Sequence, residues 1–549
     1  MNGAQWLVRT LVDCGVEQVF VLCGNGLDPL LDAFLDYGLR IVDVRNEQAA
    51  AYMADTWARL TGRLGVAAVS SGPGHTNALT GLANSWWDGG PMLLISGSSS
   101  HAMRGQGAFQ ELDQVGMAAP VCKYAAMVHS AQTLVSETQT ALTAATTSRP
   151  GPAHLTIPED VLSADVQESQ QIALRPKAVA AGAAEPALVS KAMETVNRAK
   201  RPVLIVGSGA FYAGAWPELK LLADVTGIPL FTLLWDRGCI EEAIPEYVGV
   251  VSTEVNAGSE MIARADVIVT VGARVDFRLG HGSQSMVSPD ARFVRIDADP
   301  AEVDRLRPAD IPLVGNPRTV LGQMNAEAGR HQAANAWLDQ IRTHRRSALD
   351  FWDSLPLEDC APMPSPRLCR EVRPFLQGDV TFLLDGGNIG RWAHLLFFDR
   401  HPSYWFTCGI SGVVGWGIPG AVAAKLARPA QPLLLLSGDG SAGFTLAEIH
   451  TAVRLGISYV AVIAHDSAWG IVADKQPPNR RAGSQLGEIR FDRVARSLGA
   501  CGVFVDDARQ IAPAIEAGLR SPVATFIHVP TTSHGVASYR AVLGGGMPE

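Results

Sequence analysis

The feature that most constrains the fold of this chain is a repeated alternation of short apolar runs with longer segments of helical periodicity. Runs such as 18–22, 66–70, 203–206 and 433–436 have the length of buried strands. The segments between them, such as 27–37, place apolar residues at helical spacing. Strands that alternate with helices form mostly parallel sheets with helices on both faces. The sequence therefore predicts an α/β fold.

Two stretches of weak signal divide this alternation into three units. The stretch 162–185 is polar and then rich in alanine, and the stretch 355–366 is rich in proline, as expected for linkers. A length of 549 residues suits three or four domains. We expect three doubly wound parallel-sheet domains over residues 1–180, 186–345 and 360–549.

Composition and charge exclude several classes of protein. Hydrophobic residues make up 47% of the chain and charged residues 18%, which excludes a disordered chain and a small disulfide scaffold. The net charge of −9 argues against a protein that coats nucleic acid or binds an anionic membrane. The eight cysteines form no CxxC pair, the N-terminus has no signal-peptide pattern, and no apolar run is long enough to span a bilayer. We expect a cytoplasmic protein with a small-molecule substrate.

The turn Gly438-Asp439-Gly440-Ser441 carries the clearest chemical signal. It follows the apolar run 433–436 and precedes a helical pattern over 445–455. Glycines let the backbone approach a ligand closely, and a helix N-terminus offers N–H groups to a phosphate. A carboxylate here would repel that phosphate unless a cation lay between them, so Asp439 indicates a hard divalent ion such as Mg²⁺. Asp466, at the end of the next predicted strand, offers a second oxygen ligand. The alternative is a simple tight turn, since short glycine motifs give many false positives.

This arrangement resembles the thiamine diphosphate binding motif, and the resemblance extends over nearly the whole chain. Residues 45–50, 71–77 and 107–114 resemble the N-terminal domain of the acetohydroxyacid synthase-like family. Residues 272–274 and 280–282 resemble the middle domain of benzaldehyde lyase. The pattern as a whole is most similar to benzaldehyde lyase and 2-hydroxyacyl-CoA lyase. It implies a pyrimidine-binding domain, a central Rossmann-like domain and a diphosphate-binding domain, in that order.

The resemblance implies catalytic roles for three residues. Glu47 matches the glutamate that contacts N1′ of the aminopyrimidine and shares a proton with it, and burial favours the protonated form of a carboxyl. Gln110 matches a substrate-facing glutamine, and Trp469 matches an aromatic residue of the benzaldehyde lyase pocket. The alternatives are a helix-start glutamate stabilised by the helix dipole and two ordinary packing residues.

The resemblance also implies which residues hold the cofactor and the metal. The metal ligands would be the side chains of Asp439 and Asp466 and the backbone carbonyl of Ala468. Val414 matches the bulky apolar residue that lies under the cofactor and keeps it bent. The full set of implied cofactor-binding residues is Glu47, Pro73, Thr76, Asn77, Gly386, Gly387, Asn388, Val414, Gly438, Asp439, Gly440, Ser441 and Asp466.

Two positions depart from the family pattern. The commonest pattern has Asn-Asn where this chain has His465-Asp466, and benzaldehyde lyase has a proton-transferring histidine where this chain has Gly26. The turn Gly207-Ser208-Gly209 in the central region lacks the full dinucleotide-binding spacing. FAD is therefore left open as a second cofactor but is not favoured.

The activity that the resemblance implies is a carboligase or lyase that depends on thiamine diphosphate and Mg²⁺. It would form or cleave a carbon–carbon bond beside a carbonyl, as acetolactate synthase and benzaldehyde lyase do, with 2-keto acids, 2-hydroxy ketones or aldehydes as substrates. The active sites are expected at the subunit interfaces of a homodimer or homotetramer. The alternatives are an enzyme like 2-hydroxyacyl-CoA lyase or oxalyl-CoA decarboxylase, a flavin-dependent keto-acid oxidase, and a non-catalytic paralogue.

Overall fold

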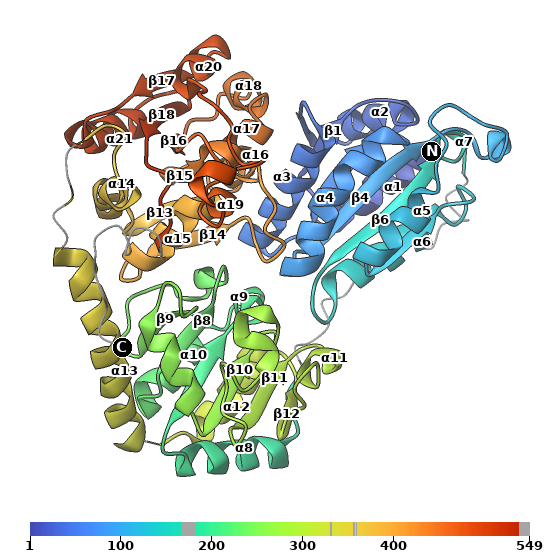
Figure 1. The fold of residues 1–549 in the computed structure, drawn as a ribbon. Helices are drawn as coiled ribbons and strands as arrows, with labels where there is room; N and C mark the ends of the chain where they lie inside the picture. The colour runs from blue at the N-terminus through green and yellow to red at the C-terminus, as the bar shows by residue number, and fades with distance from the viewer. Residues whose placement is uncertain (167–181, 330–331, 355–356, 358–359, 537–549) are drawn as a thin grey trace.

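Three units, each built on a six-stranded sheet, make up the chain in the computed structural model (Figure 1). The structure describes all residues except 167–181, 330–331, 355–356, 358–359 and 537–549. The strand pairs within each sheet are parallel, which confirms the predicted α/β class with three parallel sheets. Most of the predicted linker at 162–185 and part of the one at 355–366 lie outside the described residues. The domain bounds stay a prediction.

The N-terminal unit has the strand order β2-β1-β3-β4-β6-β5. Its strands are β1 (Gln18–Leu22), β2 (Arg40–Asp43), β3 (Gly65–Val69), β4 (Met92–Ser98), β5 (Tyr124–Met127) and β6 (Pro152–Pro158). Its helices are α1 (Gly3–Asp13), α2 (Asp28–Asp36), α3 (Glu47–Thr61), α4 (Pro73–Asp88), η1 (His101–Met103), α5 (Gln114–Ala118), η2 (Ala119–Val121), α6 (Leu134–Thr146) and α7 (Glu159–Ser163).

The central unit has the strand order β12-β11-β10-β7-β8-β9. Its strands are β7 (Pro202–Val206), β8 (Leu230–Leu233), β9 (Tyr247–Val251), β10 (Val267–Val271), β11 (Arg292–Asp297) and β12 (Ile311–Val314). Its helices are α8 (Pro186–Arg198), α9 (Ser208–Tyr212), α10 (Trp216–Thr226), η4 (Arg237–Cys239), η5 (Ala257–Arg264), η6 (Phe277–Gly282), α11 (Pro300–Val303), α12 (Pro317–Glu327) and α13 (Gln332–Ser354). The long helix α13 runs along the edge of this unit and leads to the next one (Figure 1).

The C-terminal unit has the strand order β14-β13-β15-β16-β18-β17. Its strands are β13 (Gly378–Asp385), β14 (Pro402–Thr407), β15 (Leu433–Gly438), β16 (Val460–His465), β17 (Cys501–Phe504) and β18 (Thr525–Pro530). Its helices are α14 (Ser365–Val372), η7 (Arg373–Phe375), α15 (Gly387–Leu396), α16 (Gly417–Ala427), α17 (Asp439–Phe444), α18 (Glu448–Arg454), α19 (Gly470–Ala473), η8 (Pro478–Arg480), α20 (Phe491–Ser497), η9 (Ala508–Gln510) and α21 (Ile511–Leu519).

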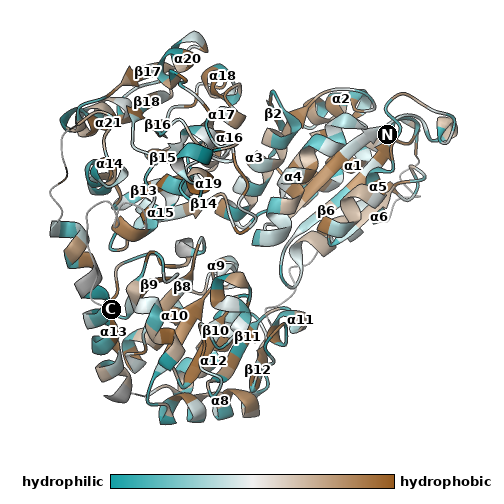
Figure 2. Cartoon of the chain, viewed as in Figure 1, coloured by the Kyte–Doolittle hydropathy of each residue, from teal (hydrophilic) through white to brown (hydrophobic). Residues whose placement is uncertain are grey.

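The position of a strand within its sheet explains its apolar composition. The central strands of each sheet are covered by helices on both faces, so they read as continuous apolar runs rather than as alternating ones, as Figure 2 shows. All eight cysteines lie among the described residues and are free thiols. Within the described part of the chain, no helix has both the length and the apolar character that a membrane span requires.

Helix α3 joins the N-terminal and C-terminal units. It begins after Asn46, whose side chain accepts a hydrogen bond from the Gln48 N–H, and it ends at Thr61, which is followed by Gly62 in the left-handed conformation. Its buried alanines pack with those of α16 in one hydrophobic core that both units share. Small side chains allow two helices to approach closely, so the alanine content of both helices favours this contact.

Candidate active site

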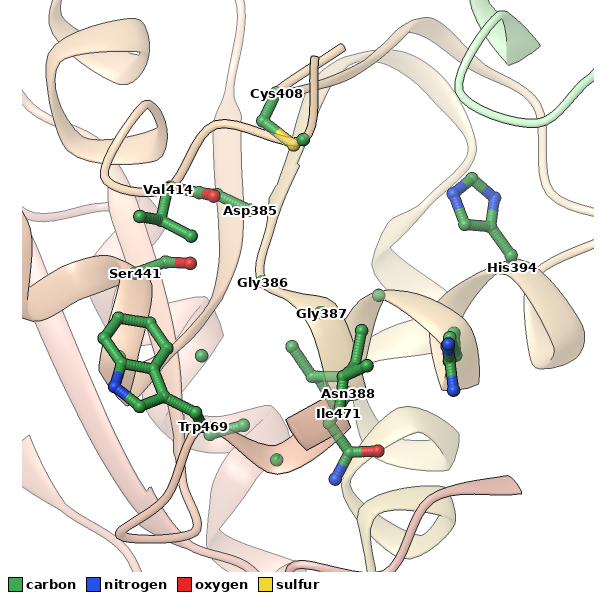
Figure 3. A pocket seen from close by; sticks show the side chains of 18 of the residues that line it. Asp385, Gly386, Gly387, Asn388, His394, Cys408, Val414, Ser441, Trp469 and Ile471 are labelled. Carbon is green, nitrogen blue, oxygen red and sulfur yellow. The ribbon is translucent and has the colours of Figure 1, made fainter. Parts of the chain in front are cut away.

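A cavity of about 540 Å³ lies between the C-terminal and central units. Among the residues that the structure describes, its lining comes only from these two units. The C-terminal unit contributes the loops that follow β13, β15 and β16 (Figure 3). The next strand in the sequence, β14, pairs with one side of β13, whereas β15 pairs with its other side. The loops after β13 and β15 therefore meet at a topological switch point, where open α/β sheets bind ligands.

The predicted metal-ligand residues lie together at this edge of the sheet. Asp439 begins α17 and is 5% exposed, and its Oδ1 accepts a hydrogen bond of 2.8 Å from the Gly440 N–H. Asp466 follows β16, and its Oδ1 accepts a bond of 3.1 Å from the Ala468 N–H. Burial, and then the neighbouring Asp466 carboxylate, raise the pKa of Asp439, and burial also raises the pKa of Asp466. A buried carboxylate beside a half-buried one favours a cation between them.

The loop after β13 offers further polar groups to a ligand. Gly386 has φ +140°, which glycine tolerates, and α15 begins immediately after it. Asn388 Nδ2 donates to Asp466 Oδ2 over 3.3 Å, whereas the buried Asn388 Oδ1 has no hydrogen-bond partner in the structure. Asp385 Oδ2 accepts from the Gly417 N–H over 2.7 Å, and burial raises the pKa of this carboxyl to about 6.

These groups fit a diphosphate with its magnesium ion. Mg²⁺ keeps few protein ligands, typically one or two carboxylates, and completes its octahedron with water and phosphate oxygens. Within the described residues no group of three or more His, Cys, Asp and Glu side chains could hold a metal by itself. The carboxylates of Asp439 and Asp466 therefore need a ligand that brings its own oxygens. The unpaired Asn388 Oδ1 and the N–H groups at the start of α15 are available to the same ligand.

The remaining predicted residues of the C-terminal unit line the same cavity. Trp469 lies on one side of it, across from Asn388 and Ile471 (Figure 3). Val414 is half-buried at the wall, and its carbonyl accepts a bond of 3.3 Å from the Tyr52 hydroxyl. The other lining residues that the sequence predicted are Gly386, Gly387, Gly438, Asp439, Gly440, Ser441, Asp466 and Ala468.

The predicted residues of the N-terminal unit form a second group. Glu47 is the first residue of α3 and is 8% exposed, and its Oε2 accepts a hydrogen bond of 3.0 Å from Asn77 Nδ2. Pro73 begins α4, and its carbonyl accepts a bond of 2.9 Å from Thr76 Oγ1. These residues follow β2 and β3, so they lie at the carboxyl edge of the N-terminal sheet.

Gln110 belongs to the same group. Its Oε1 accepts a bond of 3.0 Å from Ser71 Oγ, and its backbone has φ +59°, which is uncommon outside glycine. A Cβ added to Gly72 would lie 2.7 Å from the Gln110 carbonyl oxygen, so glycine is needed for this close approach. Strained backbone of this kind concentrates at binding sites.

The structure does not bring the two groups into one cavity of a single chain. Glu47, Asn77 and Gln110 are absent from the described lining of the cavity that holds Asp439 and Asp466. Large apolar side chains are exposed beside both groups. Phe109 is 71% and Leu112 47% exposed next to Gln110, and Phe444 is 54% exposed at the end of α17. Exposed apolar patches of this kind mark interaction sites.

The central unit builds a wall of the cavity that the sequence did not predict. Leu234 and Trp235 follow β8, Ser252 and Glu254 follow β9, and Phe277 begins η6, and all of them line the cavity. The signal that could have found them is their place at strand ends, the rule that identified Asp439. Trp235 has φ +74°, and its ring lies 5.9 Å from that of Phe277.

The structure shows the surroundings of His465 and Gly26, the two positions that depart from the family pattern. His465 is buried, its Nε2 lies 3.7 Å from Asp439 Oδ2 and accepts from the Ile489 N–H, and burial lowers its pKa. Gly26 has φ +81°, and a Cβ there would lie 2.6 Å from the Ser98 nitrogen. A histidine could not replace Gly26 without a shift of the backbone.

The glycine turn of the central unit packs against its own sheet edge. The Gly209 N–H donates to the Gly272 carbonyl over 3.0 Å. A Cβ on Gly207 would lie 2.5 Å from the same carbonyl oxygen. These glycines therefore allow close packing between the turns after β7 and β10.

Comparison with known proteins divides the chain into three parts that correspond to the three units of the structure. Residues 1–117, 189–324 and 385–529 match the N-terminal TPP-binding, central and C-terminal TPP-binding domains of the thiamine pyrophosphate enzymes. The chain is 30% identical to the acetolactate synthase isozyme 3 large subunit of Escherichia coli, over 100% of this chain and 98% of that protein. It is also 30% identical to a probable acetolactate synthase large subunit of Methanocaldococcus jannaschii, over 91% of this chain and 86% of that protein.

Proposed function

We propose a reaction for this chain from one premise: it belongs to the thiamine pyrophosphate enzyme family, and is a carboligase dependent on thiamine pyrophosphate, also called thiamine diphosphate. The proposed reaction is an acetolactate synthase-like condensation, in which a 2-keto acid loses its carboxyl group as CO₂ and its remaining acyl group forms a carbon–carbon bond to the carbonyl carbon of a second keto acid or aldehyde. The observation that carries the proposal is the cavity at the switch point, with the buried Asp439, the half-buried Asp466 and the unpaired Asn388 oxygen.

In this proposal the C-terminal unit holds the diphosphate and its metal. The carboxylates of Asp439 and Asp466 and the carbonyl of Ala468 would ligate Mg²⁺, and the N–H groups at the start of α15 would bind phosphate oxygens. Val414 and Trp469 would shield the cavity from water. When bound, the cofactor supplies the stabilised carbanion that forms or cleaves the bond beside a carbonyl.

Glu47 is the proposed proton-holding residue. Its carboxyl is 8% exposed and is oriented by Asn77, so it is shielded from water and held in one direction. It would share a proton with N1′ of the pyrimidine ring, and Gln110 would face the substrate. Pro73 and Thr76 shape the first turn of α4 beside them.

We propose that Glu47 serves the cavity of a second subunit, in a homodimer or homotetramer. The support is the separation of the two groups within one chain and the exposed Phe109 and Phe444 beside them. Mixing of two inactive variants, Glu47→Gln and Asp439→Asn, tests this. Random exchange makes half of the dimers mixed, and each mixed dimer has one intact site of two, so about a quarter of the wild-type activity should return.

The control for this experiment is a mixture of two differently tagged Glu47→Gln preparations, which should stay inactive. If both residues served one cavity of the same chain, no mixed dimer would hold an intact site. Absence of recovered activity, with subunit exchange verified by the tags, would therefore contradict the shared site. Unchanged turnover in Glu47→Gln alone would contradict the catalytic role of this residue.

A second candidate is a benzaldehyde lyase-like activity on aromatic aldehydes. The aromatic wall of Trp235, Phe277 and Trp469 favours it, since such side chains bind apolar rings. A screen of keto acids, aldehydes, benzoins and acyl-CoAs with thiamine diphosphate and Mg²⁺, read by product mass, separates the candidates. Products from two keto acids support the main proposal, aromatic 2-hydroxy ketones support the second, and a requirement for CoA contradicts both.

A further inference from the structure

The segment 407–414, here called the strap, runs from the end of β14 to the cavity wall. Cys408, Gly412, Val413 and Val414 within it line the cavity. Gly409 has φ +98° and Gly412 has φ +65°. Glycine loses more conformational freedom on ordering than any other residue, so a strap with two such positions needs outside contacts to keep one conformation.

Side chains of the N-terminal unit supply those contacts. The Asp88 Oδ1 accepts a bond of 3.0 Å from the Ile410 N–H, and the Arg59 Nη1 donates to the Thr407 carbonyl over 3.1 Å. Ser411 Oγ donates to Asn84 Oδ1. At the far end of the strap, the Tyr52 hydroxyl donates to the Val414 carbonyl. The strap of one unit is thus fixed by α3 and α4 of another.

The charged pair at the centre of these contacts is buried. Arg59 is 5% exposed and Asp88 is 3% exposed. The Arg59 Nη1 lies 3.5 Å from Asp88 Oδ2 and 3.5 Å from Asp55 Oδ2. The guanidinium also lies over the rings of Phe406 and Trp416, at 5.3 and 5.6 Å. The attraction between a buried guanidinium and its carboxylates offsets the cost of burying them only when their geometry is close, so this cluster restrains the residues bonded to it.

Close packing adds to this restraint. A Cβ added to Gly409 would overlap Asp88 Oδ2, so the strap backbone lies directly against the carboxylate. Asp88 accepts the Ile410 N–H through Oδ1, and its Oδ2 forms an ion pair with the Arg59 guanidinium without a hydrogen bond. The mechanism described above does not use Asp88, Arg59 or Asn84.

We propose that Arg59 and Asp88 are positioning residues that hold the strap, and with it Val414, in the conformation that receives the cofactor. The proposal rests on the proposed function, in which Val414 lies against the bound cofactor. The N-terminal unit would then act on its own chain's cavity through the strap, in addition to its role in a partner's cavity.

The test compares Asp88→Asn with Asp55→Asn. Both substitutions remove one carboxylate 3.5 Å from Arg59, but only Asp88 bonds the strap. An asparagine has a single acceptor oxygen, so at position 88 it leaves either Ile410 or Arg59 facing an N–H donor. We expect Asp88→Asn to weaken thiamine diphosphate binding at least tenfold by calorimetry at fixed Mg²⁺, and Asp55→Asn to change it less than twofold. Both variants should have lower unfolding temperatures.

A second measurement separates positioning from general destabilisation and from failure of the proposed function. Hydrogen exchange of the apo protein reads the strap directly, and the Ile410 amide should exchange at least tenfold faster in Asp88→Asn than in Asp55→Asn. Equal exchange and equal affinity in the two variants would overturn the proposal. Wild-type protein that binds no thiamine diphosphate would overturn the proposed function, while the exchange result would still decide whether Asp88 orders the strap.

If Asp88→Asn does not fold, Ser411→Ala provides the test, because it removes one anchor of the strap and leaves the charged pair intact. We expect it to weaken cofactor binding about threefold, in line with the loss of one hydrogen bond. An unchanged affinity together with unchanged exchange of the Ile410 amide would overturn the proposal.

Discussion

The neighbouring carboxylates of Asp439 and Asp466 at the sheet edge give a specific prediction about pH. Burial and the neighbouring Asp466 raise the pKa of Asp439 to about 8, so without metal this pair retains a proton at neutral pH. Magnesium needs both carboxylates ionised, so the ion competes with that proton. The perturbation that tests this is Asp466→Asn, which removes the neighbouring charge and keeps the size of the side chain.

The magnitude follows from the pKa. The carboxyl is half ionised at its pKa and only about one part in a hundred ionised two pH units below it, so metal-dependent affinity for thiamine diphosphate should fall about fiftyfold from pH 8 to pH 6. In Asp466→Asn the midpoint of this profile should move down by about one pH unit or more. The reason is that a shift of one unit requires the loss of only about 1.4 kcal/mol of repulsion between the two carboxylates. The folded pKa of Asp439 lies above its unfolded value, so the apo protein should also lose stability as pH rises toward 8, a loss that the substitution should reduce.

The assay is the quenching of tryptophan fluorescence by thiamine diphosphate at a fixed, subsaturating Mg²⁺ concentration between pH 6 and 9. Trp469 lines the cavity and is the expected reporter. Titration of the cofactor's own phosphates affects wild type and variant equally, so the difference between their profiles isolates the carboxylate pair. Superimposable profiles would refute the argument that Asp439 and Asp466 compete with protons for the metal.

Two further predictions concern single residues. Burial lowers the pKa of His75 to about 4, below its value in the unfolded chain. The neutral imidazole therefore contributes fully to the free energy of unfolding above about pH 6.5, and this contribution of up to about 3 kcal/mol is lost as the pH falls toward 4. His75→Gln should flatten the decline in urea-unfolding free energy between pH 7 and 4.5, and an unchanged decline would count against this assignment. A Cβ on Gly440 would lie 2.6 Å from Trp469 Cζ3, so Gly440→Ala should push the indole into the cavity and weaken calorimetric cofactor binding at least tenfold. Gly443→Ala, with open space around it, is the matched control, and equal affinities in the two would contradict the crowding.

The sequence predicted the features that depend on local pattern. Strand-length apolar runs and the turns after them located the loops at 386–388 and 438–441 and placed Asp466 one strand later. The helix expected over 445–455 was only partly right, because α17 begins at Asp439 itself and the chain turns before α18 begins at Glu448. Here the tertiary contact of Thr445, whose hydroxyl donates to the Gly415 carbonyl, interrupts the helical pattern.

Features that depend on contacts between distant segments could not be predicted. Nothing near Trp235 or Phe277 indicates that they share a cavity with loops more than 100 residues further along the chain, since this cavity forms only when the central and C-terminal units pack together. The pairing of Asp88 with Ile410 likewise joins residues 322 positions apart. Spacing and composition describe one segment at a time. A place after a strand can mark each residue as a candidate, but neither segment carries a signal of which other segment it meets.

The cavity wall formed by Leu234, Trp235 and Phe277 comes from a different unit than the groups assigned to the chemistry. The groups assigned to proton transfer and metal binding belong to the first and last units, whereas this wall belongs to the middle one. Selection, or a designer who grafts the β8 and η6 loops from a relative, could therefore retune which compounds are accepted while the reaction chemistry is inherited unchanged. Diversification in such a scaffold should concentrate in its middle third.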